Sequence, residues 1–167
     1  PQGIVKPRWL RVTGLVCADY TTRDGRGRLG AGQEGYGDGA TPPAGTPVFY
    51  PVAPYLLMTG GRITVQMPGT SPEVEWVVIV QEDQWFVTVG SDHTDRELEK
   101  TDPLRAKQMC PKVISPFTWP MSAVESHWNQ LRLRCWVQVG GGQWIPYQDE
   151  AASELMHPAE QMDMLQR

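Results

Sequence analysis

Short apolar runs, separated by Gly, Pro and Asp, limit the fold of this chain more than any other feature of its sequence. The runs are rich in Val, Ile and Trp, and they cover residues 9–17, 63–67, 75–80, 85–89, 131–139 and 144–147. Runs of this kind are typical of β-strands. We therefore predict a mainly β fold with a few short helices, at residues 95–106, 122–130 and 157–167.

A chain of 167 residues is long enough for one hydrophobic core, so residues 1–167 are expected to form a single domain. Residues 25–45 contain Gly, Ala and Pro and little that could be buried, which predicts a flexible Gly-rich loop. Such a loop could act as a lid over a site or be a disordered surface segment. Residues 82–84 and 140–142 are expected to form hairpin turns.

Composition and charge exclude several classes of partner. The formal net charge of -4 gives no reason to expect binding to nucleic acid. The apolar runs fall far short of the roughly 20 residues that span a bilayer, and the N-terminus lacks a signal-peptide pattern, so we expect a cytoplasmic protein that does not enter a membrane. Cys17, Cys110 and Cys135 are odd in number and widely spaced, which argues against a disulfide framework and a zinc site.

Three acidic residues form the first candidate site. Glu73 and Glu75 would point to the same face of a strand, because side chains alternate along a strand. The following strand runs antiparallel to it and could return Asp92 towards them. Three carboxylates close together would suit a hard divalent ion such as Mg²⁺. The alternative is that both glutamates simply lie on the solvated face of an edge strand.

A dense polar segment, residues 91–97, follows the strand at 85–89 and forms the second candidate. His93 could act as a base there, or Ser91 or Asp92 could cap a helix. Lys107 lies among apolar neighbours and could hold a substrate oxygen beside a metal, or it could be an ordinary surface cation.

Together these residues resemble the pattern of the fumarylacetoacetate hydrolase superfamily, and more closely a branch of uncharacterised bacterial proteins related to it. The superfamily pattern has a Glu-X-Glu strand, then Asp-X-Thr-Ala-Arg-Asp, then a Lys before a Pro. The matching residues here are 73–75, 92–97, and Lys107 with Pro111. The closer branch is indicated by residues 20–24, 47–50, 90–99 and 107–112.

The resemblance implies a mixed β-sandwich roll that forms homodimers and binds Mg²⁺ or Mn²⁺. It assigns the metal to Glu73, Glu75 and Asp92, a catalytic role to Lys107, and substrate contacts to Arg96 and Tyr20. Enzymes of this kind bind a small 2-oxo or 1,3-dicarbonyl acid as a metal-bound enolate, which they cleave, hydrate, decarboxylate or isomerise.

The chain also departs from the superfamily pattern. The expected His-X-X-Glu reads Ala31-Gly32-Gln33-Glu34, and Ala151 stands where a Thr is usual. We take Glu34 and His93 as the substitutes for the missing histidine. The chain ends before the last strands of the superfamily fold, which predicts a sheet that is incomplete at its C-terminus and describes a fragment, a diverged enzyme or an inactive relative.

The leading hypothesis is a Mg²⁺- or Mn²⁺-dependent hydrolase, hydratase or decarboxylase that acts on a small oxo-acid. The second is a non-catalytic β-rich binding or structural protein of the same fold. A third is a metal-free isomerase that uses His93 and Asp95 as acid and base.

Overall fold

The computed structural model of the protein describes residues 11–19, 21–22 and 47–166. These residues fall into two compact units. The described part of unit 1 is residues 11–17 and 50–128, and that of unit 2 is residues 18–19, 21–22, 47–49 and 129–166. The expectation of a single domain stays a prediction, and each unit is described by itself below.

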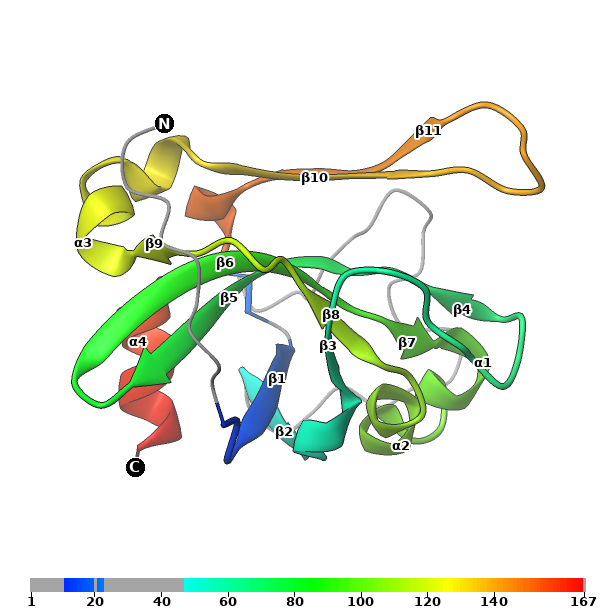
Figure 1. The fold of residues 1–167 in the computed structure, drawn as a ribbon, viewed down its shortest axis with the longest axis horizontal. Helices are drawn as coiled ribbons and strands as arrows, with labels where there is room; N and C mark the ends of the chain where they lie inside the picture. The colour runs from blue at the N-terminus through cyan, green and yellow to red at the C-terminus, as the bar shows by residue number, and fades with distance from the viewer. Residues whose placement is uncertain (1–10, 20, 23–46, 167) are drawn as a thin grey trace. The chain divides into compact units, whose positions relative to one another are not determined.

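Unit 1 is built around a hairpin of two long strands, β5 (Val74–Gln81) and β6 (Gln84–Asp92), as Figure 1 shows. The two strands pair antiparallel in unbroken register, from Val74 opposite Ser91 to Gln81 opposite Gln84. Glu82 in the two-residue turn has a φ of 54°, as the tight turns that match the twist of a hairpin require. This confirms the hairpin predicted at residues 82–84.

The sheet of unit 1 has the strand order β3-β8-β6-β5, with β9 also paired to β6. Strand β3 (Leu57–Thr59) runs parallel to β8 (Lys112–Ile114), which is antiparallel to β6. Strand β9 (Trp119–Pro120) pairs with β6 nearer its start. Two further short strands, β4 (Thr70–Ser71) and β7 (Thr94–Asp95), pair with each other just beyond the end of β6.

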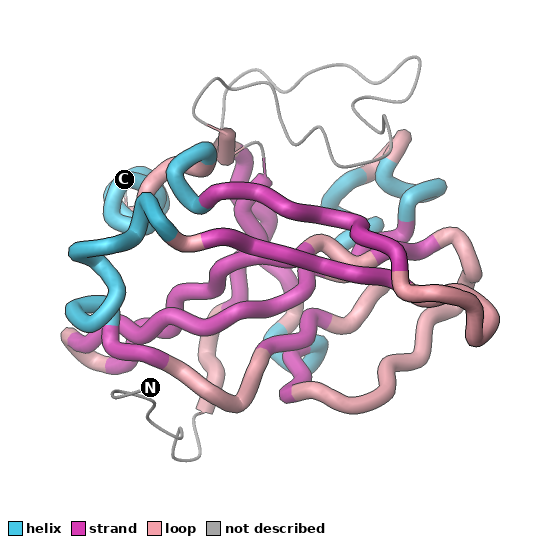
Figure 2. The backbone as a smooth tube through the Cα atoms, turned by 90° about the horizontal axis from the view of Figure 1, so that it is seen from above, coloured by secondary structure: helices cyan, strands magenta, loops and turns pink. Residues whose placement is uncertain are grey.

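The helices of unit 1 are short. They are η1 (Pro54–Leu56), α1 (Arg96–Glu99), α2 (Pro103–Gln108) and α3 (Met121–Val124), which is followed by η2 (Glu125–Gln130), whose last two residues belong to unit 2. The single helix predicted at residues 95–106 is thus two helices, because Asp102 begins a new cap before Pro103. The backbone view in Figure 2 shows how little of the fold is helical.

Strands β1 (Leu15–Asp19) and β2 (Val48–Val52) form a two-stranded sheet, and the boundary between the units falls within both. Unit 2 also contains the ribbon of β10 (Arg132–Val137) and β11 (Ile145–Ala151), then η3 (Ala152–Glu154) and α4 (Pro158–Leu165). Gly140 and Gly141 have positive φ in the loop of this ribbon, which confirms the turn predicted at residues 140–142.

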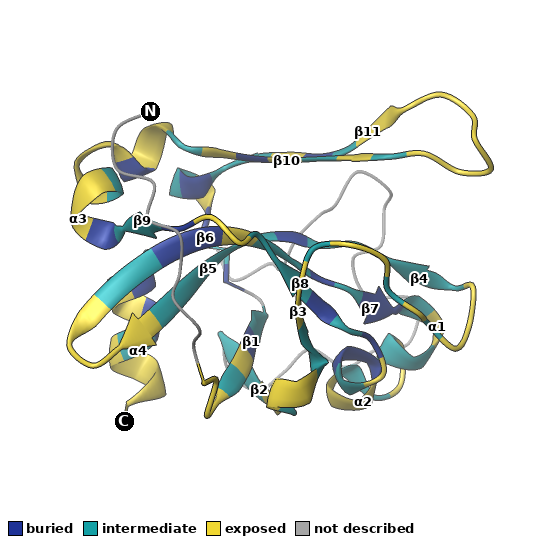
Figure 3. Ribbon diagram, viewed as in Figure 1, coloured by how far each residue is buried: buried dark blue, intermediate teal, exposed yellow. Residues whose placement is uncertain are grey.

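Each unit has its own buried residues. Ala106, Cys110 and Trp128 are among the most buried in unit 1, and the rings of Trp128 and Trp76 meet edge to face at 5.6 Å. In unit 2 the buried residues include Leu155 and Ala152, whereas the loop between β10 and β11 is exposed (Figure 3).

The prediction of a mainly β fold with few short helices is confirmed. The strand predicted at residues 63–67 is wrong, because that segment has no regular structure. Its polar and apolar residues alternate as in a strand, but it follows two glycines with positive φ, Gly60 and Gly61, and pairs with no neighbour. The sandwich roll and the incomplete C-terminal sheet stay predictions. In the described part of the chain, no helix is both long and apolar enough to cross a membrane.

Candidate active site

Two of the predicted acids, Glu73 and Asp92, meet at the open end of the β5–β6 hairpin. Glu73 immediately precedes β5 and Asp92 is the last residue of β6, and the amide of Asp92 donates a 2.9 Å hydrogen bond to the carbonyl oxygen of Glu73. Figure 1 shows β7, α1 and α2 gathered at this end, away from the hairpin turn. The pairing of the two strands therefore places the two carboxylates side by side.

Lys107 connects these two carboxylates. Its Nζ lies 2.9 Å from Oδ2 of Asp92 and 3.4 Å from Oε2 of Glu73. The Lys107 side chain is only 1% exposed, so the two carboxylates, and not water, must compensate the charge of its ammonium. The prediction that Lys107 lies near the acids is therefore supported by the geometry, and the alternative of an ordinary surface cation is not.

A second buried lysine, Lys112, also lies against Asp92. Its Nζ is 2.7 Å from Oδ1 of Asp92, in an ion pair outside hydrogen-bond geometry, and it donates a 2.6 Å hydrogen bond to the carbonyl oxygen of His93. Burial alone would raise the pKa of Asp92, but Lys107 and Lys112 outweigh it and hold the pKa below its usual value. Asp92 is thus a buried carboxylate that stays charged.

Arg96, at the start of α1, holds Glu73 from the other side. Its Nη1 lies 3.1 Å from Oε1 of Glu73 and 2.8 Å from Oε2 of Glu99, and its Nε donates to Ser71 Oγ at 2.5 Å. Burial would lower the pKa of Arg96, but Glu73 and Glu99 raise it above its ordinary value. Thr94, which is fully buried in β7, donates to Oε2 of Glu73 at 3.2 Å.

The local structure fixes these side chains through helix caps. The Asp95 carboxylate accepts hydrogen bonds from the amides of Glu97 and Leu98 and so caps α1, which begins with Arg96. Asp102 caps α2, which carries Lys107, by accepting from the amide of Arg105. Because its carboxylate caps a helix, Asp95 has a structural role that the isomerase hypothesis did not include.

Glu75, the third predicted metal ligand, lies on β5 opposite Gly90. Among the residues that the structure describes, no three His, Cys, Asp or Glu side chains form a group that could hold a metal ion. The structure therefore brings together Glu73 and Asp92 but does not bring Glu75 into the same group.

His93 is half-buried, and its Nε2 lies 2.9 Å from Oγ1 of Thr70. Burial, with added effects from Lys112 and Arg96, lowers the pKa of His93. The surroundings of the ring therefore favour its uncharged form, which a general base requires. Tyr20, Glu34 and the loop predicted at residues 25–45 lie outside the described residues.

Sequence reasoning gave no role to Lys112 and Ser71, whereas it named Glu99 or Glu97 as a partner of Arg96, and the structure has the pair with Glu99. Lys112 begins a short strand of ordinary composition, and only the pairing of β8 with β6, which sets Lys112 opposite Asp92, reveals its contact. Glu99 lies one helical turn beyond Arg96, a spacing typical of ion pairs, and this signal is present in the sequence. Cys17 and Cys110 are buried and in no disulfide, and burial raises the pKa of both thiols.

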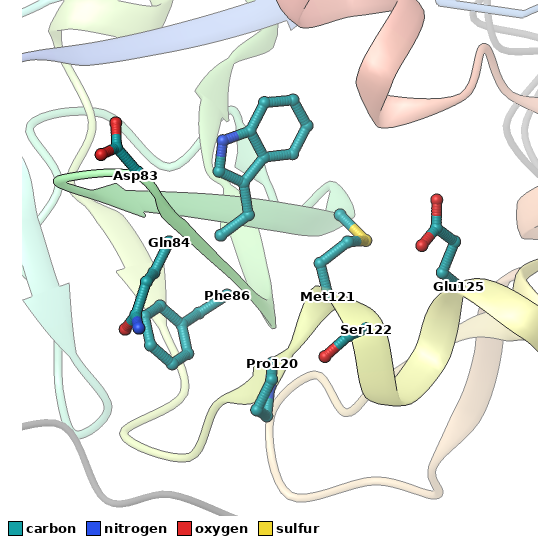
Figure 4. A pocket seen from close by; sticks show the side chains of 8 residues that line it. Asp83, Gln84, Phe86, Pro120, Met121, Ser122 and Glu125 are labelled. Atoms are coloured by element: carbon teal, nitrogen blue, oxygen red, sulfur yellow. The ribbon is translucent and has the colours of Figure 1, made fainter.

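A separate pocket of about 480 Å³ lies at the other end of β6, near the hairpin turn. Figure 4 shows side chains of β6 on one side and Met121 and Glu125 on the other. It is lined by Asp83, Gln84, Trp85, Phe86, Pro120, Met121, Ser122 and Glu125. Of the predicted site residues that the structure describes, none lines this pocket.

Comparison with solved structures identifies the class of fold. One match is described as 2-keto-3-deoxyarabinonate dehydratase in a hexagonal crystal form, with 18% identity, a TM-score of 0.58, and coverage of 72% of this chain and 46% of that one. Another is the apo form of 2-keto-3-deoxy-D-arabinonate dehydratase, with 17% identity, a TM-score of 0.63, and coverage of 92% and 56%. At this identity the likeness shows the fold alone. This chain spans about half the length of these proteins.

The chain belongs to the family described as "Protein of unknown function (DUF2848)", whose sequence model matches residues 18–167. No curated protein sequence matches the chain.

Proposed function

We propose that this chain carries the site of a Mg²⁺- or Mn²⁺-dependent hydrolase, hydratase or decarboxylase that acts on a small 2-oxo or 1,3-dicarbonyl acid. The observation that supports this most is the convergence of Glu73 and Asp92 on one shared cation, the ammonium of Lys107. A structure likeness to a dehydratase adds support from the fold.

The donor chemistry of the site fits a divalent ion. Glu73 and Asp92 supply carboxylate oxygens, the ligands that Mg²⁺ and Mn²⁺ prefer, and they already hold a positive charge between them. We assign the metal to these two residues with Glu75, which is two residues from Glu73 along the chain. In the described part of this structure the three carboxylates do not form one metal-binding group. A metal bound there would serve as a Lewis acid for negative charge on the substrate oxygens.

The protein's own residues supply the remaining chemistry. Lys107 brings a positive charge to the same place and would stabilise an enolate oxygen electrostatically. The lowered pKa of His93 favours its uncharged ring, which could accept a proton from the substrate or from water, with Glu34 as the other candidate. Arg96 orients Glu73 in this structure, and its contact with substrate, like that of Tyr20, is part of the proposal.

Calorimetric titration of Mg²⁺ and Mn²⁺ into chelator-treated protein tests the metal site. We expect binding to wild type that weakens at least tenfold in Glu73→Gln and in Asp92→Asn, since each loses a ligand. Asp149→Asn makes the same chemical change at an exposed carboxylate in unit 2 and should bind as wild type does. Circular dichroism confirms that each variant is folded. If neither metal binds wild type, the metal-dependent function is wrong.

Turnover tests the reaction class. Purified protein with Mn²⁺ should decarboxylate or cleave oxaloacetate or an acylpyruvate, and Lys107→Met should abolish this. Because these enzymes are expected to act as homodimers, we also propose a dimer, and light scattering that shows a monomer would contradict it.

A second candidate is a non-catalytic protein of the same fold. It is favoured by the charge balance of the site, where three carboxylates meet three cations within the protein: Glu73, Asp92 and Glu99 with Arg96, Lys107 and Lys112. A network whose charges balance in this way can have a purely structural role, in which it stabilises the fold. Turnover that depends on metal and on Lys107 would exclude this candidate.

A further inference from the structure

The pocket near the hairpin turn lies apart from the candidate active site. Its residues on β6 are Gln84, Trp85 and Phe86, at the start of the strand, whereas Asp92 is the last residue of the same strand. All eight lining residues belong to unit 1. The volume of about 480 Å³ falls among pockets that bind small organic molecules, which measure about 300–1,000 Å³. The pocket is therefore large enough for a ligand of its own.

The charged side chains of this pocket all have one sign. Asp83 and Glu125 are exposed carboxylates, and no Lys, Arg or His is among the eight described residues that line the pocket. Neither acid forms an ion pair with a residue that the structure describes. In this they differ from Glu73 and Asp92, whose carboxylates are paired with lysine and arginine. A ligand that fills this pocket must therefore bring the positive charge.

The uncharged part of the lining suits a hydrocarbon chain. Trp85 and Phe86 are partly buried and Met121 is buried. Aromatic faces attract organic ammonium ions, and a thioether adapts its shape to an apolar ligand. Figure 4 shows Asp83 and Glu125 at opposite sides of the group of lining side chains. They come from different elements, since Asp83 lies in the turn between β5 and β6 and Glu125 begins η2.

We propose that this pocket binds a small aliphatic diamine, with one ammonium group at Asp83, the other at Glu125, and the methylene chain against Trp85, Phe86 and Met121. Two ammonium groups balance two separated carboxylates, whereas a monoamine leaves one of them without a partner and a neutral molecule leaves both. This site is separate from the proposed metal site and does not depend on it.

NMR titration of the wild-type protein with putrescine, an aliphatic diamine, tests the pocket. The signal to follow is the indole N–H of Trp85, which is assigned by its loss in Trp85→Phe. We expect a saturable shift of this signal. The indole signal of Trp144, which does not line the pocket and is assigned in the same way, should stay unchanged.

Two related compounds test the match of charges. Butylamine has one ammonium group on the same length of chain, and we expect it to bind about fivefold more weakly than putrescine, because it gives up one exposed ion pair. Butanediol has no charge and should cause no shift at the concentration at which putrescine saturates the protein.

Four variants locate the contacts. Asp83→Asn and Glu125→Gln each remove one charge at an exposed position and keep the shape of the side chain, so each should weaken putrescine binding about fivefold. Glu82→Gln is the matched control, because Glu82 is exposed in the same turn but does not line the pocket, and its affinity should stay within about twofold of wild type. Gln84→Lys keeps both acids and adds an ammonium to the lining, which should abolish binding.

The outcomes are decisive in wild type and in the variants. The absence of a Trp85 shift with putrescine would overturn the proposal, and so would butylamine that binds as tightly as the diamine. An equal loss of affinity in Glu82→Gln and Asp83→Asn would show attraction to general negative charge at the turn in place of a site. Failure of Mg²⁺ to bind at Glu73 and Asp92 would leave this pocket untouched, since none of its eight lining residues belongs to that site.

Discussion

The amide of Asp92 is hydrogen-bonded to the carbonyl oxygen of Glu73 at 2.9 Å, and this one backbone contact explains why two acids so far apart in the chain share a lysine. It continues the register of the β5–β6 hairpin by one step beyond the pair of Val74 and Ser91. A slip of one residue in that register would turn one carboxylate to the other face of the sheet. The register of the hairpin therefore sets the geometry of the site.

Neutralising Asp92 should destabilise the protein strongly. In Asp92→Asn two ammonium groups, those of Lys107 and Lys112, would lose a charged partner while only 1% and 4% exposed. Breaking a buried ion pair by removing one partner typically costs about 3–5 kcal/mol. Urea unfolding at pH 7, in the presence of chelator, measures the loss.

The matched control is Asp149→Asn, which removes the same charge from an exposed pair and should cost much less stability, because exposed ion pairs contribute little. Equal losses in Asp92→Asn and Asp149→Asn would show that the buried network does little for stability.

A methyl group at Gly90 should also destabilise the fold, by crowding the centre of the sheet of unit 1. A Cβ there would lie 2.8 Å from the carbonyl oxygen of Val113 on β8 and 2.8 Å from Cγ2 of Val77 on β5. Overpacking of this kind costs about 1–3 kcal/mol. Gly14→Ala is the control, because a Cβ at Gly14 meets nothing within 4 Å. Urea midpoints that fall equally in both variants would contradict this reading of the sheet.

The hairpin and the meeting of two acids could be predicted from the sequence, because both follow from local patterns. Alternating apolar residues and a short polar turn define two antiparallel strands, and antiparallel pairing returns residue 92 to residue 73. The position of Glu75 could not be predicted in this way. The alternation of side chains along a strand places Glu75 on the same face as Glu73. Whether its carboxylate also lies near Asp92 depends on the packing around it.

The role of Lys112 and the irregular structure of residues 63–67 also could not be predicted, because both depend on long-range strand pairing. The role of Lys112 depends on β8 lying between β3 and β6, and no local pattern in the sequence specifies that order. Residues 63–67 alternate as a strand does, yet alternation shows only that a segment could pair. It does not supply a partner.

The cap of α2 gives a third prediction. Asp102 accepts a 3.1 Å hydrogen bond from the amide of Arg105, and the helix it begins carries Lys107. Asp102→Ala should lower the free energy of unfolding by about 1 kcal/mol, since an uncapped helix start loses one partner for its amides. Asp102→Asn keeps a capping oxygen and should stay close to wild type. An alanine variant as stable as the asparagine variant would show that the cap is unimportant.

The pKa of Asp149 gives the last prediction, in unit 2. Arg132 and Arg134 on β10 hold this carboxylate at 2.7 and 3.2 Å, and the hydrogen bond from Arg132 is the main reason that the pKa of Asp149 lies below its ordinary value. Because the pKa of Asp149 is lower in the folded protein than in the unfolded chain, its pairing with the arginines stabilises the fold at pH values above the ordinary pKa. This contribution is lost as the pH falls through the lowered value.

Carboxyl NMR titration should place the Asp149 pKa below that of an unstructured peptide. High salt should raise it towards that reference, because exposed charges are screened. Arg132→Gln should raise it more than Arg134→Gln does, and a pKa that neither salt nor Arg132→Gln moves would show that the arginines do not hold this carboxylate in solution.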